Sequence, residues 1–475
     1  GEWYLARLLV HKAWRNFELS DVILTNGSEL TPTYGRNSIE SKLMRSSWDC
    51  TPECFDLWAT SAFGNRALRV SAKFRFRRLC HKKGWDYHLL CKEWWQSSML
   101  RYPRDDQKNL RVFEVFKRML SHVTLKVNHS RFSTVRKNNK KDRPIDLQPI
   151  CNMVVQRRIG NGIRNLLNNE FGVNLNNLAD THRVMIKDSL LATIDLQNAS
   201  DSISLNLIRF LFPKSAFDLI DQSRTSMTYG LDGHMHLLNK VSSMGNGFTF
   251  ELMSFILFCV GKQMDNSFSV FGDDIITKNT TAERVITVLS AVGFVVNEDK
   301  SFVNSEFRES CGANWLDGHG YIESYDFEYP QTITDCIVIY NKTVRLLNYP
   351  SFAALNGSLT RAIPKSLRGA RPSYMAEPDG YQKPLDALEF FWTPGKPESL
   401  IRIPNVVRSK IADWLSRMNL GDDYQVIPGF VTKVLSYSPK RAHLQPRAHI
   451  GKYFMYLNGG CKTEDVLKGS EYDTQ

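Results

Sequence analysis

Two adjacent carboxylates, Asp273 and Asp274, end the segment Phe-Gly-Asp-Asp at 271–274. Apolar residues lie on both sides, at 268–270 and 275–276. This short apolar–turn–apolar pattern predicts a β-hairpin with both acids at its tip. Paired carboxylates suit Mg²⁺, which binds through one or two carboxylates together with substrate phosphates. A plain surface turn is the alternative, because Gly-Asp pairs are common in hairpins.

Gly-Asp-Asp occurs a second time, at 421–423, in a different context. Apolar residues at helical spacing precede it within 411–420. Glycine is the usual residue at the end of a helix. We therefore predict a helix end and a turn at 421–423 rather than a site.

The composition of the 475 residues is that of an ordinary globular protein, with 42% hydrophobic and 23% charged residues. This length accommodates two to four domains or one large multi-lobed enzyme. The formal net charge of +12 favours a polyanionic partner, although ribosomal and membrane-surface proteins share such an excess. Nine scattered cysteines form no disulfide framework, which is typical of a reducing compartment.

No apolar run approaches the ~20 residues needed to span a bilayer, and residues 1–10 lack a signal-peptide pattern. The first residue is Gly1 rather than Met, so we expect a processed, tagged or truncated chain. We expect a soluble protein of the cytoplasm with no membrane partner.

Two basic segments are candidates for contact with a polyanion. Residues 69–83 carry seven Lys or Arg and no acid, a pattern typical of either a solvated helix face or a backbone-binding strip. Residues 131–143 contain Asn-Asn and precede a proline, which predicts a loop or a strand and turn rather than a helix, either solvated or able to neutralise a triphosphate. The candidates for RNA binding in the first segment are Lys73, Arg75, Arg77 and Arg78.

A third acid, Asp195, follows the apolar run 190–194, which predicts a buried strand. Ser-Asp-Ser at 200–202 then resembles a helix start, because Ser and Asp are strong N-cap residues. Capping is thus the structural alternative to a functional role for Asp201. Further on, glycines flank Asn246 in a turn where the backbone can approach a ligand closely. An apolar helix follows this turn and is most simply part of the core.

Three acids of this kind can hold two Mg²⁺ ions ~3.5–4 Å apart for in-line phosphoryl displacement, and Mn²⁺ would substitute. One ion would activate a 3′-hydroxyl group, and the other would steady the leaving pyrophosphate. The basic loop near Arg143 would bind the triphosphate, and Lys300 would protonate the leaving group. The combination resembles the template-directed nucleic-acid polymerases.

Five segments carry a closer resemblance. They are Ala-Thr-Ile-Asp-Leu at 192–196, Ala-Ser-Asp-Ser-Ile-Ser at 199–204, Ser-Met-Gly-Asn-Gly-Phe-Thr-Phe-Glu-Leu at 243–252, Phe-Gly-Asp-Asp-Ile-Ile at 271–276 and Phe-Arg-Glu-Ser-Cys-Gly at 307–312. They resemble the replicase, an RNA-directed RNA polymerase catalytic subunit, of single-stranded RNA bacteriophages such as MS2 and Q-beta. The match is dense over about residues 131–325 and weak on both sides.

The resemblance implies an α+β, right-handed fingers–palm–thumb fold whose antiparallel palm sheet carries the metal-binding acids. Fingers with an N-terminal helical region would span 1–188. The palm would span 189–340, with a fingers insertion at about 205–240. The thumb and C-terminal region would span 341–475.

The same resemblance implies roles for individual residues. The catalytic metals would be bound by Asp195, Asp273 and Asp274, and Lys300 would be the acid. The incoming nucleotide would meet Asp201 and Asn246 at its ribose, Ser243 and Gly245 in the same loop, and Lys137, Lys141 and Arg143 at its triphosphate. Synthesis would be templated by RNA and would start without a primer. Expected partners are RNA, NTPs, the host translation elongation factors Tu and Ts, and a host ribosomal protein.

The sequence departs from the family pattern at Phe271, where tyrosine is usual, and at Met253, where relatives commonly carry a second glutamate. A reverse transcriptase is the nearest alternative. Such enzymes place an aromatic residue shortly after the first metal-binding acid, whereas 196–201 contains none, which favours ribonucleotides. A non-catalytic RNA-binding protein is the other alternative, supported by net charge alone.

Overall fold

The computed structural model describes residues 1–25, 30, 42–43, 45, 47–136, 142–322, 330, 336, 339–340, 343, 350–362, 370–371 and 381–382. The chain divides into two compact units, Gly1–Arg136 with Asp142–Ser324, and Lys137–Lys141 with Tyr325–Gln475. The predicted turn at 421–423 and the two loop lysines, Lys137 and Lys141, lie outside the described residues. Most of the predicted thumb does so too.

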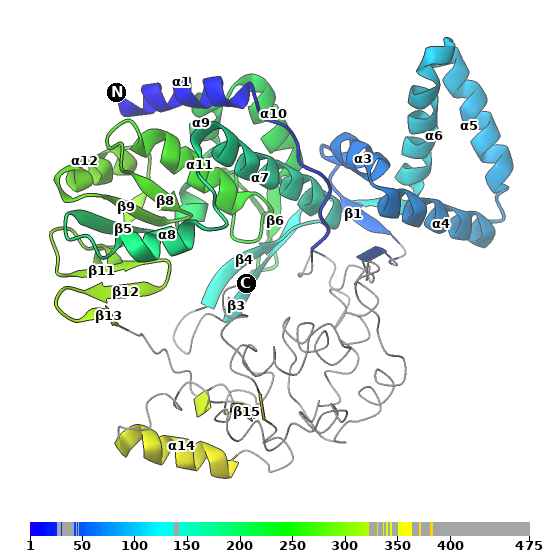
Figure 1. Cartoon of the computed structure of the whole chain (residues 1–475). Coiled ribbons are helices and arrows are strands. Elements are labelled where there is room, and N and C mark those ends of the chain that lie inside the picture. Colours follow the sequence, from blue (N-terminus) through cyan, green and yellow to red (C-terminus); the bar gives the residue numbers. More distant parts are fainter. Residues whose placement is uncertain are drawn as a thin grey trace, which may run out of the picture. The chain divides into compact units, whose positions relative to one another are not determined.

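The N-terminal part of the first unit is mainly helical, as predicted. Its elements are α1 (Glu2–Trp14), β1 (Trp48–Cys50), α3 (Phe55–Gly64), α4 (Arg66–Lys83), α5 (Tyr87–Arg101), the 3-10 turn η1 (Asp105–Gln107), α6 (Lys108–Val123) and β2 (Thr124–Lys126). The side chains of Asn65 and Asp86 accept backbone N–H groups at the starts of α4 and α5. Figure 1 shows α5 and α6 as a helical pair that extends away from the rest of this unit.

A mixed sheet follows, in the strand order β4-β3-β6-β7. Its strands are β3 (Ser130–Arg136), β4 (Asp142–Leu147), β6 (Met227–Tyr229) and β7 (Met235–Leu237). The basic segment 131–143 is therefore largely the antiparallel pair β3–β4. Two helices follow β4 in the chain, α7 (Ile150–Phe171) and α8 (Leu178–Met185).

The acids lie on a separate sheet of strand order β10-β5-β9-β8, antiparallel throughout. Its strands are β5 (Leu191–Gln197), β8 (Ser269–Phe271), β9 (Asp274–Lys278) and β10 (Val295–Val296). Around it lie η2 (Ala199–Ser202), α9 (Leu205–Leu211), α10 (Lys214–Ser223), α11 (Thr249–Gly261), α12 (Asn279–Ser290) and η3 (Glu298–Lys300). A three-stranded sheet of β11 (Phe307–Ser310), β12 (Ala313–Leu316) and β13 (Gly320–Ile322) completes the unit.

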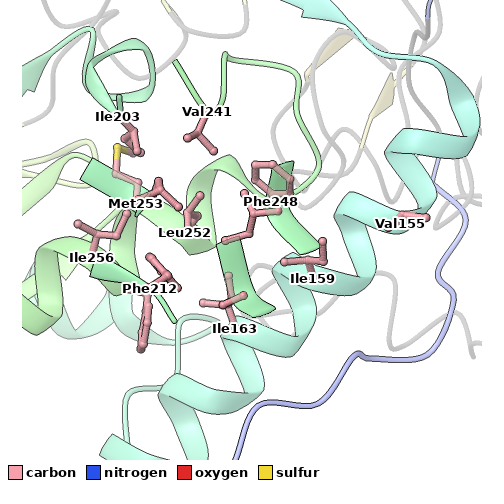
Figure 2. Packing of buried hydrophobic residues seen from close by; sticks show 14 of the residues in the cluster. Val155, Ile159, Ile163, Ile203, Phe212, Val241, Phe248, Leu252, Met253 and Ile256 are labelled. Atoms are coloured by element: carbon pink, nitrogen blue, oxygen red, sulfur yellow. The ribbon is translucent and has the colours of Figure 1, made fainter. Parts of the chain in front are cut away.

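The core of the first unit is centred on α11, which contacts α1, α7 and β8. Nearly every residue of α11 is buried, which matches its apolar sequence on all sides. Figure 2 shows Ile159 and Ile163 of α7 beside Phe248 and Leu252. Each fully buried side chain of this size contributes roughly 1.5–3 kcal/mol. The predicted core helix is therefore confirmed, and it supports the sheet that carries the acids.

In the second unit the described elements are α14 (Pro350–Ala362) and the short parallel pair β14 (Ala370–Arg371) and β15 (Tyr381–Gln382). The α+β class is confirmed. None of the helices in the described residues is both long enough and apolar enough to cross a membrane.

Candidate active site

The predicted hairpin is present as β8 and β9, and Gly272 and Asp273 form its turn. Gly272 adopts φ +66°, and a Cβ added there would lie 2.7 Å from the ring of Phe250. Its N–H donates to Ser254 Oγ of α11 at 2.9 Å. Only glycine therefore satisfies both the turn and the close approach to α11. This requirement fixes the position of the two acids that follow.

Asp195 lies directly opposite Asp274 in the register of β5 and β9. Directly paired residues of antiparallel strands project from the same face of a sheet. Asp273 lies in the adjoining turn, so both hairpin acids are held next to Asp195. The sequence prediction placed Asp195 at the end of its strand, whereas β5 continues to Gln197.

The segment that contains η3 holds Asp195 in place. Asn297 Nδ2 donates to Asp195 Oδ2 at 2.7 Å, and the Asn297 N–H donates to the Asp195 carbonyl at 2.8 Å. The Asp195 N–H in turn donates to Ser301 Oγ at 3.1 Å. Sequence reasoning missed Asn297 and Ser301, because nothing in the local pattern relates them to a strand about a hundred residues earlier.

The electrostatics of the acids show how closely they are grouped. Burial and then the charge of Asp195 raise the pKa of Asp273, while Lys300 and Arg143 oppose this rise. Burial and then the charge of Asp273 raise the pKa of Asp274 to about 6, against hydrogen bonds from Cys311. The carboxylates therefore repel one another and are short of positive charge.

The three acids are candidate ligands for a metal ion. Among the residues that the structure describes, no group of three or more His, Cys, Asp or Glu side chains is arranged to hold one. The chemistry of the three acids nevertheless fits Mg²⁺, because their hard carboxylate oxygens adjoin across β5 and the hairpin turn, and their mutual repulsion favours a cation between them. The described residues thus contain no preformed cage, and the three acids are the groups that would bind such an ion.

The two cations that influence Asp273 come from different elements. Lys300 ends η3, and its Nζ lies 3.6 Å from Glu309 Oε1 of β11. Arg143 is exposed near the start of β4, where its partner in the register is Val135. The structure thus brings Lys300 and Arg143 into the electrostatic surroundings of the acids.

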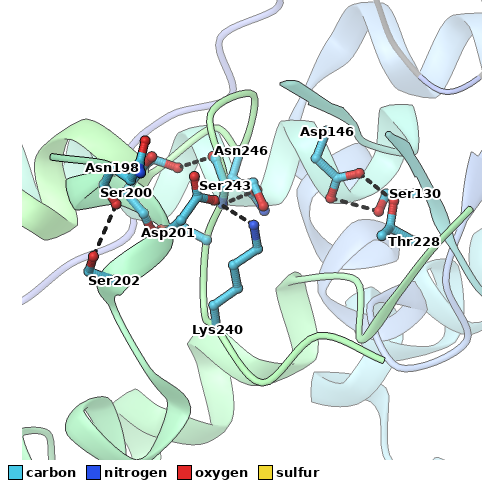
Figure 3. Close-up of polar contacts among 12 residues, drawn as sticks. Ser130, Asp146, Asn198, Ser200, Asp201, Ser202, Thr228, Lys240, Ser243 and Asn246 are labelled. Carbon is cyan, nitrogen blue, oxygen red and sulfur yellow. Dashed lines mark hydrogen bonds and ion pairs between the residues drawn. The ribbon is translucent and has the colours of Figure 1, made fainter. Parts of the chain in front are cut away.

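Asp201 lies in the turn η2 and forms an ion pair with Lys240, with 2.5 Å between Nζ and Oδ1 (Figure 3). The expectation of a helix start at 200–202 was wrong. The next helix, α9, begins at Leu205, and its N-cap is Ser204, whose side chain accepts the N–H of Leu207. Asp201 therefore does not cap a helix. Lys240 is a further residue that sequence reasoning missed.

The loop 243–247 is stabilised from within. The Asn246 side-chain oxygen accepts the N–H of Ser243 at 2.9 Å, and the Asn246 N–H donates to the Ser243 carbonyl at 3.2 Å. Gly245 adopts φ +118°, and a Cβ there would lie 2.5 Å from the carbonyl oxygen of Asp146. Gly245 thus permits a close approach to neighbouring backbone of the same chain. The expected approach of this loop to a ligand stays a prediction.

The basic segment 69–83 forms most of α4, and its cations do not share one environment. Lys73, Arg77 and Arg78 are exposed. Arg75 is 5% exposed, donates to the carbonyls of residues 42 and 43, and lies 3.5 Å from the ring centroid of Trp48. Burial lowers the pKa of Arg75 to about 9. The prediction that Arg75 binds RNA is therefore corrected, since its side chain is engaged inside the fold.

The two departures from the family pattern both lie near the hairpin turn, Phe271 at the end of β8 and Met253 on α11. Phe271 packs edge to face on Phe250, with 4.7 Å between ring centroids. Met253 is buried in α11 and lies close to Gly272. An apolar residue at 253 thus fills the space under the hairpin turn.

The chain is similar in sequence to a family of viral proteins. The family described as RNA replicase, beta-chain, matches residues 90–389. The RNA-directed RNA polymerase subunit beta of Enterobacteria phage SP is 36% identical over 259 residues, which cover 51% of this chain and 45% of the relative. The RNA-directed RNA polymerase beta chain of Escherichia phage MS2 is 40% identical over 195 residues, which cover 39% and 35% respectively.

The chain therefore spans less than half the length of these two relatives. Among solved structures, the RNA-dependent RNA polymerase of a human picorbirnavirus has a TM-score of 0.34 and 13% identity. That match covers 50% of this chain and 58% of the other.

Proposed function

Because the chain belongs to the RNA replicase beta-chain family, we propose that it is the catalytic chain of an RNA-directed RNA polymerase that copies a single-stranded RNA phage genome. The observation that carries the proposal is the register that places Asp195 opposite Asp274, with Asp273 in the adjoining turn. In this proposal the sheet β10-β5-β9-β8 belongs to the palm within 189–340. Residues 1–188 would supply fingers, and 341–475 the thumb.

In the proposed reaction, the 3′-oxygen of the product strand forms a bond to the α-phosphorus of an NTP, and the bond to pyrophosphate breaks. Asp195, Asp273 and Asp274 would hold two Mg²⁺ ions, which when bound supply activation of the 3′-hydroxyl and charge neutralisation of the leaving group. Arg143, with Lys137 and Lys141, would orient the triphosphate. Lys300 would donate a proton to the departing pyrophosphate.

The function is tested by nucleotide incorporation on a single-stranded RNA template with Mg²⁺ or Mn²⁺. We expect incorporation of NTPs without a primer, and the assay would be run with and without the host elongation factors Tu and Ts and a host ribosomal protein. Purification of the chain from its host would identify which partners accompany it. A chain that binds RNA but incorporates no nucleotide under any of these conditions would favour the non-catalytic alternative.

We expect Asp201→Ala to reduce the preference for NTPs over dNTPs by about tenfold, the effect of losing one hydrogen bond to the 2′-hydroxyl. The ratio of kcat/KM for an NTP and its dNTP measures this. Asp221→Ala is the control, because Asp221 also lies in an aspartate–cation pair, with Arg224 at 2.7 Å on α10. An unchanged ratio in Asp201→Ala would show that Asp201 does not take part in sugar recognition.

We expect the double variant Arg77→Gln/Arg78→Gln to weaken RNA binding and to lower the slope of log affinity against log salt by about 1, because two phosphate contacts are lost. Titration of a single-stranded RNA at several salt concentrations measures the slope. The double variant Lys12→Gln/Arg15→Gln removes two exposed cations, one in the last turn of α1 and one at its C-cap, and is the control. Equal slopes for the two variants would exclude α4 as a specific contact.

A further inference from the structure

A continuous set of buried polar side chains leads from β4 to the loop 243–247. Asp146 of β4 accepts hydrogen bonds from Ser130 Oγ at 2.7 Å and Thr228 Oγ1 at 2.8 Å (Figure 3). It also accepts one from Gln148 Nε2 at 2.9 Å. Gln148 Oε1 then accepts Gln156 Nε2 of α7 at 3.1 Å. Because buried polar groups are costly unless paired, these bonds fix the participating elements relative to one another.

Gln156 is the last side chain of this set, and both ends of its amide are used. Its Nε2 also donates to the carbonyl of Ser223 at 2.9 Å, while its Oε1 accepts the backbone N–H of Gly247 at 2.9 Å. The side chain has no exposed surface. Gln156 is thus a direct link between α7 and the end of the loop.

The loop lies against α7 with little room to move. A Cβ at Gly247 would lie 2.9 Å from the backbone nitrogen of Arg157, and a Cβ at Gly160 would lie 2.8 Å from the Gly247 carbonyl oxygen. At the other end, the Asp146 N–H donates to the Met244 carbonyl at 2.8 Å. Ser243, Gly245 and Asn246 are therefore presented from a backbone held at Met244 and Gly247.

We infer that Gln156 is a positioning residue for the nucleotide-binding loop, and this inference rests on the proposed polymerase function. Gln156 fixes the position of Gly247 relative to α7 and so places the Asn246 side chain for the incoming nucleotide. It would touch no substrate itself. Its loss should weaken ground-state and transition-state binding alike, which raises KM for NTPs and leaves kcat nearly unchanged.

The chain offers a matched control on the same helix. Asn152 lies one turn before Gln156, is equally buried, and also donates to the Ser223 carbonyl, at 3.0 Å. Its remaining bonds go to Thr51, with Nδ2 at 2.8 Å from Thr51 Oγ1. Gln156→Met and Asn152→Leu are near-isosteric, and both remove buried hydrogen bonds, but only the first disconnects the loop.

We expect the two full-length variants to lose similar amounts of thermal stability. Only Gln156→Met should raise KM for NTPs, by about tenfold, as expected for one buried N–H left unpaired. Hydrogen exchange at the Gly247 amide should accelerate in Gln156→Met and not in Asn152→Leu, which measures the loop without any catalysis. Equal rises in KM, or unchanged exchange at Gly247, would overturn the positioning role. If the wild-type chain incorporates no nucleotide, the proposed polymerase function is wrong. Hydrogen exchange at the Gly247 amide would still test the hydrogen bond from Gly247 to Gln156.

Discussion

Asp273→Asn will abolish Mg²⁺-dependent RNA synthesis while RNA binding survives. The substitution keeps the size of the side chain at the hairpin turn but removes one of the three grouped charges. We expect a loss of at least ~10³-fold in incorporation, equivalent to about 4 kcal/mol of transition-state stabilisation. Incorporation on an RNA template and RNA binding, measured on the same preparation, separate the two effects.

The same variant should unfold at a higher temperature when Mg²⁺ is left out. Burial and the charge of Asp195 raise the pKa of Asp273, so the ionised form destabilises the fold at neutral pH. Removing that charge removes the penalty. A rise in Tm together with a loss of activity would mark a residue kept for chemistry rather than for folding.

The chain contains its own control for this experiment. Asp422→Asn makes the same change in the second Gly-Asp-Asp, where we expect undiminished synthesis. Asp195→Asn should reproduce the loss seen with Asp273→Asn, because Asp195 is paired directly with Asp274 on the adjacent strand. Full synthesis by either Asp195→Asn or Asp273→Asn would contradict the proposed mechanism.

Asp265→Ala should cost about 4 kcal/mol of unfolding free energy, the largest stability loss that we expect. Asp265 is buried between α11 and the hairpin, and its carboxylate accepts from Ser267 N–H and Oγ, Thr277 Oγ1 and Lys278 N–H at 2.7–2.8 Å. Alanine would leave these donors unpaired, and each unpaired buried donor costs roughly 1–3 kcal/mol. Urea unfolding measures the difference.

This contribution should depend on pH in a defined direction. Burial alone would raise the pKa of Asp265, but the hydrogen bonds from Lys278, Ser267 and Thr277 hold it well below its usual range. A depressed pKa in the folded state stabilises the fold above the unfolded value, and the benefit is lost as the pH falls. The difference between wild type and Asp265→Ala should therefore shrink below about pH 4, near the ordinary pKa of an aspartate.

Asp218→Ala is the control for stability. Asp218 forms an ion pair with Lys214 at 2.8 Å on an exposed part of α10. Exposed pairs of this kind contribute about 0–1 kcal/mol. A loss in Asp218→Ala as large as that in Asp265→Ala would show that the buried hydrogen bonds are not the cause.

Local patterns in the sequence predicted the elements that carry the acids. A glycine between apolar runs is enough to predict the hairpin, and a largely apolar stretch is enough to predict α11. The supporting residues could not be predicted in this way. Asn297, Lys240 and Gln156 act on partners far away in the sequence, and such contacts exist only once the sheet and α7 have packed.

Two of the local errors have physical causes of the same kind. Charge in the segment 69–83 does not reveal which side of α4 faces inward, so the buried Arg75 was grouped with exposed cations. Ser-Asp-Ser at 200–202 contains residue types that commonly cap helices, but these residues form a 3-10 turn. Ser204 is the N-cap of the next helix instead. Composition identifies residue types suited to a role, and packing decides which residue fills it.

The central position of α11 also bears on how the chain folds. Ala6, Val10, Ala13 and Trp14 of α1 are buried, and α1 packs on α11, which follows much later in the sequence. Contacts of such long sequence separation slow folding, because loop closure must precede the contacts that compensate it. During synthesis α1 would leave the ribosome long before α11, so the apolar residues of α1 that pack on α11 would be exposed to solvent until then. The first unit is therefore expected to close its core late, with an interval in which chaperones could bind.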